Sequence, residues 1–114
     1  MARRYRRMAW IRFAGFTLDL VRRRLTDAAD REIVLTAMEF DLLRTLAERP
    51  GRALSRDQLL DLAHAKDIEP FDRSIDIRIT RVRRKLGDDA AQPHLIRTVR
   101  GLGYMFAPAA GTPD

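Results

Sequence analysis

The segment 73–86 holds the densest group of side chains that could take part in chemistry. The segment contains six basic residues but only one acidic residue, Asp76. Arginine pairs bidentately with phosphate and with the edge of guanine, whereas a solvated structural helix normally mixes both signs of charge. This excess of positive charge predicts a polyanionic partner, with an ordinary arginine-rich surface as the alternative. The basic residues are Arg73, Arg78, Arg81, Arg83, Arg84 and Lys85.

An apolar stripe indicates how this segment would present its charges. Ile75, Ile79, Val82 and Leu86 follow one another at spacings of four, three and four, which predicts an amphipathic helix over 73–86. With about 100° between residues, the opposite face would be available to a partner. That face carries Arg73, Ile77, Thr80, Arg81 and Arg84, and it is flanked by Arg78, Arg83 and Lys85.

Ile77 is an apolar side chain on this predicted polar face. A thymine methyl group in the major groove of DNA would cover it. Contact with the end of a neighbouring hairpin, or the simple exposure of one apolar side chain, would account for it equally well. The sequence leaves these explanations open.

A second candidate for polyanion binding follows at 95–106. Two strand-like runs flank Arg100-Gly101-Leu102-Gly103, which predicts a hairpin with glycines in its turn. The glycines let the backbone turn tightly, so that Arg100 can project from the tip into a narrow minor groove. Thr98 and Tyr104 add a hydroxyl and a phenol. Directly after a basic amphipathic helix, this hairpin indicates a DNA-binding module.

Enzymatic and metal-binding functions find no support in the sequence. It has no glycine-rich phosphate loop, nucleophile elbow or paired-carboxylate motif, so we expect no enzyme. It has no cysteine, and His64 and His94 are far apart, so we expect neither a metal site nor a cofactor. No apolar run reaches the ~18 residues of a membrane span, and no signal peptide is visible, which favours a cytoplasmic protein without a membrane partner.

The composition fits one basic domain. The 114 residues suit a single core, and 46% hydrophobic with 33% charged residues favour folding over disorder. The formal net charge is +6, and all the basic residues except Lys66 and Lys85 are arginine. A GC-rich genome or a need for solubility would produce the same bias. The placement of the arginines on 73–86 is therefore the stronger argument.

The elements that precede this helix would have to support it. Largely alternating apolar residues over 11–20 predict two short strands around Gly15, and further strands are expected near 23–25 and 32–35. Residues 1–10 are rich in arginine and have no period of a buried element. We interpret them as a basic linker or arm.

Two capping boxes mark the beginnings of further helices. Thr36 and Glu39 have the spacing at which their side chains satisfy each other's backbone amides, and Ser55 and Gln58 repeat it. Apolar residues at helical spacing follow each pair, and Pro50-Gly51 ends the first run. We therefore expect helices that begin at Thr36 and Ser55.

Four segments resemble the signature segments of the C-terminal effector domain of OmpR/PhoB-family response regulators. The resemblance runs from about residue 11 to 107 and implies an α+β fold. This fold is a winged helix-turn-helix with an N-terminal antiparallel four-stranded sheet, a three-helix bundle and a C-terminal β-hairpin wing. The segments are 35–43 (LTAMEFDLL), 55–60 (SRDQLL), 72–79 (DRSIDIRI) and 98–104 (TVRGLGY).

The resemblance also implies a function and the residues that perform it. The output domain of a two-component transcriptional regulator would bind double-stranded DNA, with helix 73–86 in the major groove and wing 95–106 in the minor groove. Arg81 matches the position nearest the bases, and Asp76 and Ile77 match positions that face base edges. Arg100 matches the wing arginine of the minor groove. Positions associated with the phosphate backbone are Arg73, Arg78, Thr80, Arg83, Thr98 and Tyr104.

The match is not complete at two places. The helical wheel points Arg84 further outward than Arg83, but an oblique helix lets flanking residues reach phosphates, so we favour Arg83 as the backbone contact. Many members have Trp near the end of the second helix, where this chain has His64. The surrounding LAHAK is more similar to the OmpR branch.

The resemblance extends to partners and to domain organisation. The loop 65–71 resembles the segment that family members offer to RNA polymerase, and members bind tandem direct repeats as pairs, so a second copy on the operator is expected. No receiver domain precedes residue 11, which favours an excised effector domain, over 11–107, rather than a free-standing regulator. We interpret 108–114 as a flexible tail. The alternatives to sequence-specific DNA binding are non-specific DNA binding and the use of the winged helix to contact an acidic protein.

Overall fold

The short strands predicted at the beginning of the chain form one antiparallel sheet. The computed structural model describes residues 10–63, 74–88 and 94–108. Ala14 and Gly15 both have positive φ, the conformation of a tight hairpin turn, as predicted around Gly15. The first strand begins at Trp10, one residue inside the segment interpreted as an arm. The strands β1 (Trp10–Phe13), β2 (Phe16–Asp19), β3 (Arg24–Thr26) and β4 (Glu32–Ile33) pair in this order.

Both predicted capping boxes are present and begin helices at the expected positions. The Thr36 hydroxyl accepts from the N–H of Glu39, and the Glu39 carboxylate accepts from the N–H of Thr36. Ser55 and Gln58 make the same exchange. Residue 73, where we expected the third helix to begin, lies outside the described residues. The helices are α2 (Ala37–Ala47), α3 (Arg56–Leu62) and α4 (Ser74–Leu86).

A strand that the sequence analysis missed joins the helices to the hairpin. The hairpin consists of β6 (Ile96–Val99) and β7 (Gly103–Phe106), and β5 (Ala53–Ser55) pairs with the free edge of β7. A Cβ atom on Gly103 would lie 2.0 Å from the carbonyl oxygen of Leu54. Glycine is therefore needed at 103 for the close approach of two backbones, whereas we had expected it to serve the turn.

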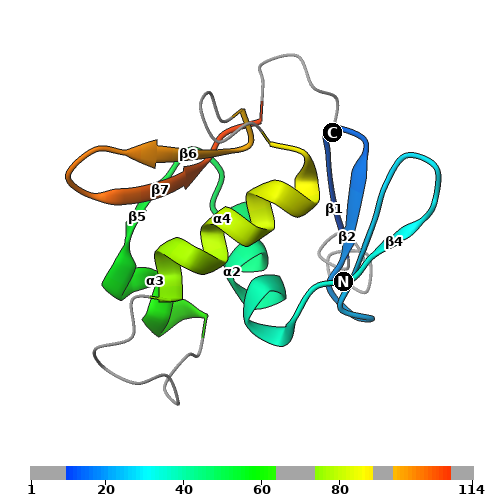
Figure 1. Cartoon of the computed structure of the whole chain (residues 1–114), viewed down its shortest axis with the longest axis horizontal. Helices are drawn as coiled ribbons and strands as arrows, with labels where there is room; N and C mark the ends of the chain where they lie inside the picture. The colour runs from blue at the N-terminus through cyan, green and yellow to red at the C-terminus, as the bar shows by residue number, and fades with distance from the viewer. Residues whose placement is uncertain (1–9, 64–73, 89–93, 109–114) are drawn as a thin grey trace, which may run out of the picture.

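The helices lie between the two sheets. Figure 1 shows the N-terminal sheet on one side of α2 and α4, and the hairpin on the other, pointing away from that sheet. Near the base of the hairpin the rings of Phe13 and Phe106 meet edge to face, with centroids 5.0 Å apart, which ties the N-terminal sheet to β7. No described helix is long and apolar enough to cross a membrane.

One hydrophobic core holds these layers together. The apolar residues predicted to face inward from the two long helices do so: Phe40, Leu43 and Ile79 are at most 2% exposed. They belong to a single cluster with residues of both sheets. The apolar stripe of α4 is thus anchored in the core, and its remaining faces are left for other contacts.

Candidate nucleic-acid interface

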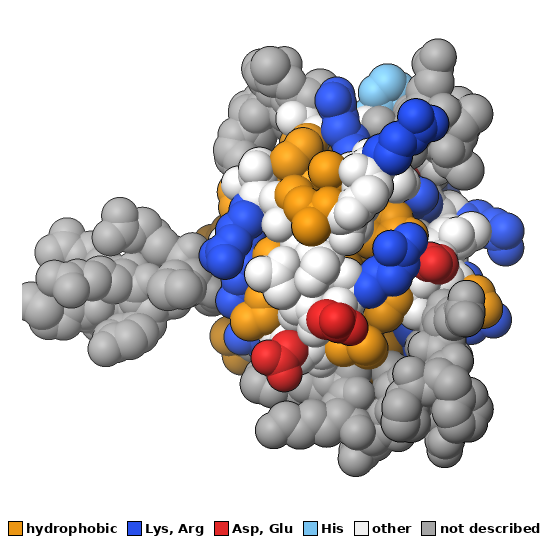
Figure 2. All heavy atoms as spheres, turned by 90° about the vertical axis from the view of Figure 1, so that its left-hand side faces the viewer, with side chains coloured by type: hydrophobic (Ala, Val, Ile, Leu, Met, Phe, Trp, Pro, Cys, Tyr) orange, Lys and Arg blue, Asp and Glu red, His pale blue; other side chains and the backbone are white. Residues whose placement is uncertain are grey.

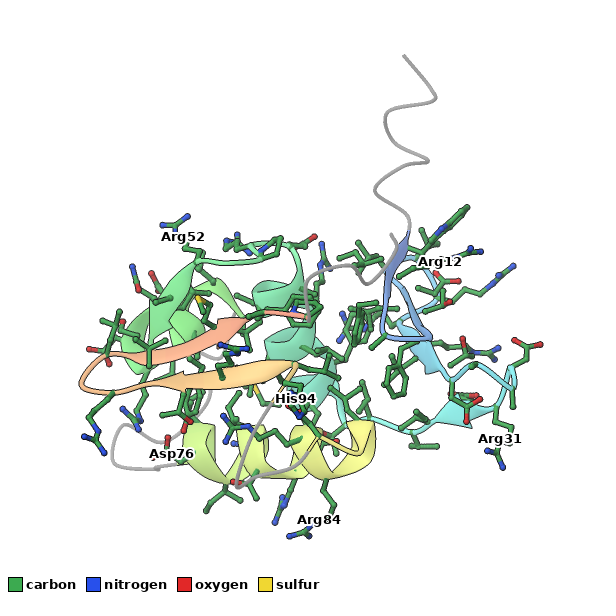
Figure 3. All side chains as sticks on the ribbon, turned by 90° about the horizontal axis from the view of Figure 1, so that it is seen from above. Arg12, Arg31, Arg52, Asp76, Arg84 and His94 are labelled. Carbon is green, nitrogen blue, oxygen red and sulfur yellow. The ribbon has the colours of Figure 1, made fainter. Side chains whose placement is uncertain are left out.

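The outward face of α4 is the one that its sequence period predicted. The stripe residues are buried, while Ile77, Thr80, Arg81 and Arg84 are exposed. Ile77 is 52% exposed, so the hairpin does not cover it. Figure 3 shows Arg84 pointing away from both the helices and the hairpin. This uncovered face offers two guanidinium groups and a β-branched apolar side chain, with which it can contact a polyanion.

Arg83 has a different environment from its neighbour Arg84. It is 8% exposed, and its guanidinium donates two hydrogen bonds to the carbonyl oxygen of Ile96, at 2.9 and 2.7 Å, and a third to the Thr98 hydroxyl at 2.9 Å. The helical wheel was therefore right about which arginine points outward. Arg83 and Thr98 join α4 to β6, and whether either also contacts phosphate stays a prediction.

Lys85 also turns inward rather than toward a partner. Its ammonium donates to the carboxylate of buried Glu39 at 2.6 Å and to the carbonyl oxygen of Val34 at 2.9 Å. Burial raises the pKa of Glu39, but the hydrogen bonds from Lys85 and Thr36 and the charge of Lys85 outweigh it, so the pKa is lowered. Lys85, which the sequence analysis placed beside the outward face of this helix, therefore connects α4 to the beginning of α2.

Asp76 and Tyr104 meet where α4 approaches the hairpin. The Tyr104 hydroxyl donates to the Asp76 carboxylate at 2.5 Å, and Arg56 donates to the same oxygen from its Nε at 2.8 Å. Burial and the neighbouring carboxylate both raise the pKa of Tyr104. Asp76, in turn, raises the pKa of Arg56. Arg56 was not among the predicted site residues, because as the first residue of α3 its sequence position indicated only a helix start.

Arg78 combines partial burial with an unsatisfied group. Its Nη1 atom is buried and has no hydrogen-bond partner within the described part of the chain. An unpaired buried donor is costly, and a charged one more so. Among the predicted site residues that the structure describes, Arg78 is the one with a buried donor that has no partner in that part of the chain.

The hairpin tip has the conformation that its glycine predicted. The N–H of Leu102 donates to the carbonyl oxygen of Val99 at 2.9 Å, and Gly101 has a φ of +77° in the third position of this turn. Arg100, in the second position, is exposed. Leu102 is also exposed. The tip therefore presents a guanidinium and an apolar side chain on a turn braced by three strands.

The face toward which the hairpin points is mixed in character. In Figure 2 basic side chains surround an area of hydrophobic and uncharged atoms, and a few acidic side chains lie among them. Arg56 and Arg97 are exposed residues of α3 and β6 that the sequence analysis did not single out. The period-2 pattern of the hairpin could have indicated Arg97, since it alternates with buried Ile96.

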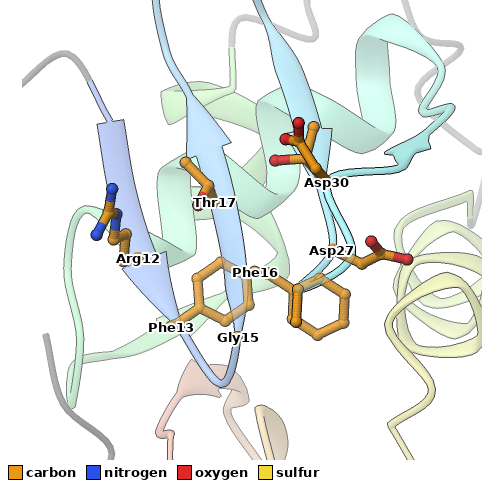
Figure 4. A pocket seen from close by; sticks show the side chains of 9 residues that line it. Arg12, Phe13, Gly15, Phe16, Thr17, Asp27 and Asp30 are labelled. Atoms are coloured by element: carbon orange, nitrogen blue, oxygen red, sulfur yellow. The ribbon is translucent and has the colours of Figure 1, made fainter.

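A pocket elsewhere on the molecule does not involve the predicted site. It has a volume of about 320 Å³ and lies on the N-terminal sheet, where Arg12, Phe16 and Asp27 contribute to its lining (Figure 4). Backbone hydrogen bonds, from Arg31 above all, lower the pKa of Asp27, so this carboxylate is already satisfied within the chain. No group of described residues could hold a metal ion.

Several predicted features lie outside the described residues, among them nearly all of the basic arm and of the C-terminal tail. Arg73, assigned to the phosphate backbone, falls in the gap between α3 and α4. The loop 65–71, assigned to RNA polymerase, falls in the same gap. Both stay predictions.

The fold and sequence of this chain match those of known regulators. Residues 30–106 match the family described as "Transcriptional regulatory protein, C terminal". The chain is 48% identical over 104 residues to the transcriptional regulatory protein AruR of Pseudomonas aeruginosa, which covers 91% of the chain and 43% of AruR. The chain thus spans less than half of this relative.

Solved structures show the same likeness. The crystal structure of the Klebsiella pneumoniae RstA DNA-binding domain in complex with the RstA box gives a TM-score of 0.77 at 38% identity, over 88% of this chain and 98% of that one. The response regulator DrrB of Thermotoga maritima, an OmpR/PhoB homolog, gives 0.76 at 30% identity, over 92% of this chain and 48% of that one.

Proposed function

The chain belongs to the family of transcriptional regulatory proteins that share this C-terminal domain, and on that basis we propose that it binds double-stranded DNA sequence-specifically. The observation that carries the proposal is the outward face of α4. This face is exposed and cationic, on a helix whose other sides are held by the core and the hairpin. In a helix-turn-helix the second helix enters the major groove, which is wide enough to admit it.

Several residues of α4 would then have a defined contact. Arg81 would donate to a guanine edge, and Ile77 would pack on a thymine methyl group. Arg78 and Thr80 would contact phosphates. These contacts follow from the chemistry of the side chains and from their positions on the helix.

The hairpin would add a contact in the minor groove. Arg100 stands at the tip of a turn that three strands brace, and a narrow minor groove has the negative potential that attracts arginine. RstA, at 38% identity over nearly the whole domain, was solved in complex with its DNA box, which supports DNA binding by this chain.

We further infer that the DNA-binding unit is the output half of a two-component response regulator. The chain covers 43% of AruR and 48% of DrrB, so the remainder of such a protein would supply the receiver. Loop 65–71 would contact RNA polymerase, and a second copy would occupy the neighbouring repeat of the operator.

Selection of bound sequences from a random duplex pool, followed by salt titration of the selected duplex, tests the proposal. We expect a defined sequence motif and an affinity that falls as salt rises, because phosphate contacts release counterions. Equal, salt-dependent affinity for every duplex would show non-specific binding. The absence of binding to any duplex would overturn the proposal and favour a winged helix that contacts an acidic protein.

A further inference from the structure

Three segments that are distant in the sequence meet at one carboxylate oxygen. Oδ1 of Asp76, in the first turn of α4, accepts from the Tyr104 hydroxyl of β7 and from Nε of Arg56 at the beginning of α3. The guanidinium of Arg56 also lies over the Tyr104 ring, 5.6 Å from its centroid. Hydrogen bonds to an ionised acceptor are stronger than neutral ones. This joint therefore connects both helices of the helix-turn-helix to the hairpin.

Arg83 forms a second joint on the same side of α4. It follows Asp76 by seven residues, close to two helical turns, so both side chains lie on one face of the helix. Its guanidinium holds Ile96 and Thr98 of β6 and lies 5.4 Å from the Tyr104 ring centroid. The hairpin is thus attached to α4 at two points, and its other edge is attached to β5, where Gly103 permits close contact.

This arrangement argues against a direct reading of bases by Asp76. Figure 3 shows Asp76 on the side of α4 that faces the hairpin, where its side chain is 47% exposed, whereas Arg84 points away from the hairpin. A carboxylate that faced DNA would repel phosphates, and here Arg56 balances its charge at 2.8 Å. The negative charge also lies in the first turn of α4, where the helix dipole favours it.

We propose that Asp76 is a positioning residue that locks the hairpin to the recognition helix through Tyr104 and so sets the distance between the major-groove and minor-groove contacts. The inference rests on the proposed function. In this view the protein discriminates between DNA sequences in two ways: by the bases that α4 contacts, and by the distance between the major-groove contact of α4 and the minor-groove contact of the hairpin. Asp76 would act on DNA only through the elements it holds.

The joint can be tested first in the free protein. Tyr5 is replaced by Phe so that the absorbance of ionised tyrosine reports on Tyr104 alone. Because the Asp76 carboxylate raises the pKa of Tyr104, Asp76→Asn should lower it, and the matched control Asp61→Asn, the same charge change on α3, should not. Circular dichroism at each pH shows that the variants stay folded. An unchanged Tyr104 titration in Asp76→Asn would overturn the joint.

The consequence for DNA is tested with duplexes in which zero, one or two base pairs separate the major-groove motif from an A·T-rich flank. The parent and Asp61→Asn should favour one spacing. Asp76→Asn and Tyr104→Phe should each bind that duplex about tenfold less tightly, as loss of one charge-assisted hydrogen bond would give, and should lose the spacing preference. The double variant should be no weaker than Asp76→Asn alone, because Tyr104→Phe then removes only the partner of a bond that Asp76→Asn has already weakened.

The outcomes separate this inference from the proposed function. A changed base preference within the motif for Asp76→Asn, with the spacing preference intact, would make Asp76 a base reader and overturn the proposal. Additive losses in the double variant would also overturn it. If the parent binds none of the duplexes, the proposed function itself fails, and the Tyr104 titration still decides whether the joint exists.

Discussion

Neighbouring arginines of α4 differ in what they can do for a partner. The guanidinium of Arg83 donates hydrogen bonds to the carbonyl oxygen of Ile96 and the hydroxyl of Thr98, whereas the guanidinium of Arg84 projects from the surface. Exposed Arg81 lies on the same outward face as Arg84. At the scale of single residues, burial therefore separates cations that stabilise the domain from cations that can bind.

Arg81 should be the residue whose loss changes sequence preference. Replacing it with Ala should weaken binding to the selected duplex by about 1 to 3 kcal/mol and relax discrimination at particular positions, because a base-edge contact is lost. Binding to a panel of single-base variants of the selected duplex measures this. Arg31→Ala, the same charge change at an exposed site near the N-terminal sheet, is the control. Equal preferences for Arg81→Ala and the parent would show that α4 does not read bases.

Arg83 and Arg84 should respond differently to the same substitution. Arg83→Ala should lower the free energy of unfolding by about 2 kcal/mol, because buried acceptors lose a charged donor, and Arg84→Ala should change it by less than about 0.5 kcal/mol. Arg84→Ala should instead weaken binding to all duplexes and reduce the salt slope by about one phosphate equivalent. Urea unfolding and salt titration of both variants provide the measurements. Equal loss of stability would contradict the assignment.

Arg100 should act on the flank of the site. Arg100→Ala should reduce affinity most on duplexes with an A·T-rich flank, while preference inside the major-groove motif survives. The salt dependence should fall by at most about one phosphate equivalent. Paired duplexes with A·T-rich and G·C-rich flanks measure the effect. If variant and parent discriminate the flanks equally, Arg100 is a solvated turn residue.

At the scale of elements, the attachment of α4 to α2 depends on a partly buried ion pair, in which Glu39 is buried and the Lys85 side chain is 34% exposed. Glu39 closes the capping box of α2 and also accepts from Lys85 of α4, so one carboxylate serves both the beginning of a helix and the packing of two helices. Its pKa is lowered in the folded chain, below the ordinary value of 4.5. The folded state therefore favours the ionised form.

This lowered pKa makes stability depend on pH in the acid range. The contribution of Glu39 is present above about pH 4.5 and is lost as the pH falls through its lower folded pKa. Lys85→Met should remove it, so the stability difference between parent and variant should be largest at neutral pH and shrink toward pH 3. Urea unfolding at each pH measures this, with Arg84→Met as the charge-matched control. A difference that does not vary with pH would refute the role of the pair.

At the scale of the whole molecule, the part of this basic domain that the structure describes presents no surface built for self-association. The large apolar side chains exposed among the described residues lie on separate elements and form no heptad seam. Those side chains are Trp10, Val21, Val34, Ile77 and Leu102. Pairing would then depend on DNA that carries two adjacent sites.

We accordingly expect a monomer in solution and two copies on an operator with tandem direct repeats. Sedimentation of the free domain should give the mass of one chain, and sedimentation on duplexes with one or two repeats should give one or two bound copies. The spacing between the repeats is varied as a control, since copies that touch on DNA require a fixed separation. A tight dimer of the free domain would contradict this expectation.

The sequence alone determined the helices, the N-terminal strands and the hairpin, in their order, because the signals for these are local. The capping boxes at Thr36 and Ser55 lie within four residues, and the apolar stripe of α4 lies within one helix. Four distinctive segments in the right order also sufficed to identify the family. The outward face of α4 and the exposed Arg100 at the hairpin tip follow from the same local patterns.

The tertiary structure decided which of the candidate residues are already engaged, because their partners are distant in the chain. Strand β5 is too short to show a period and exists through its pairing with β7. Lys85 bonds to Glu39 across 46 residues, Asp76 to Tyr104 across 28, and Arg83 to Ile96 across 13. A helical wheel gives the direction of a side chain but not the residues that it contacts. Only the packed fold could therefore separate the cations that hold the hairpin from those available to bind DNA.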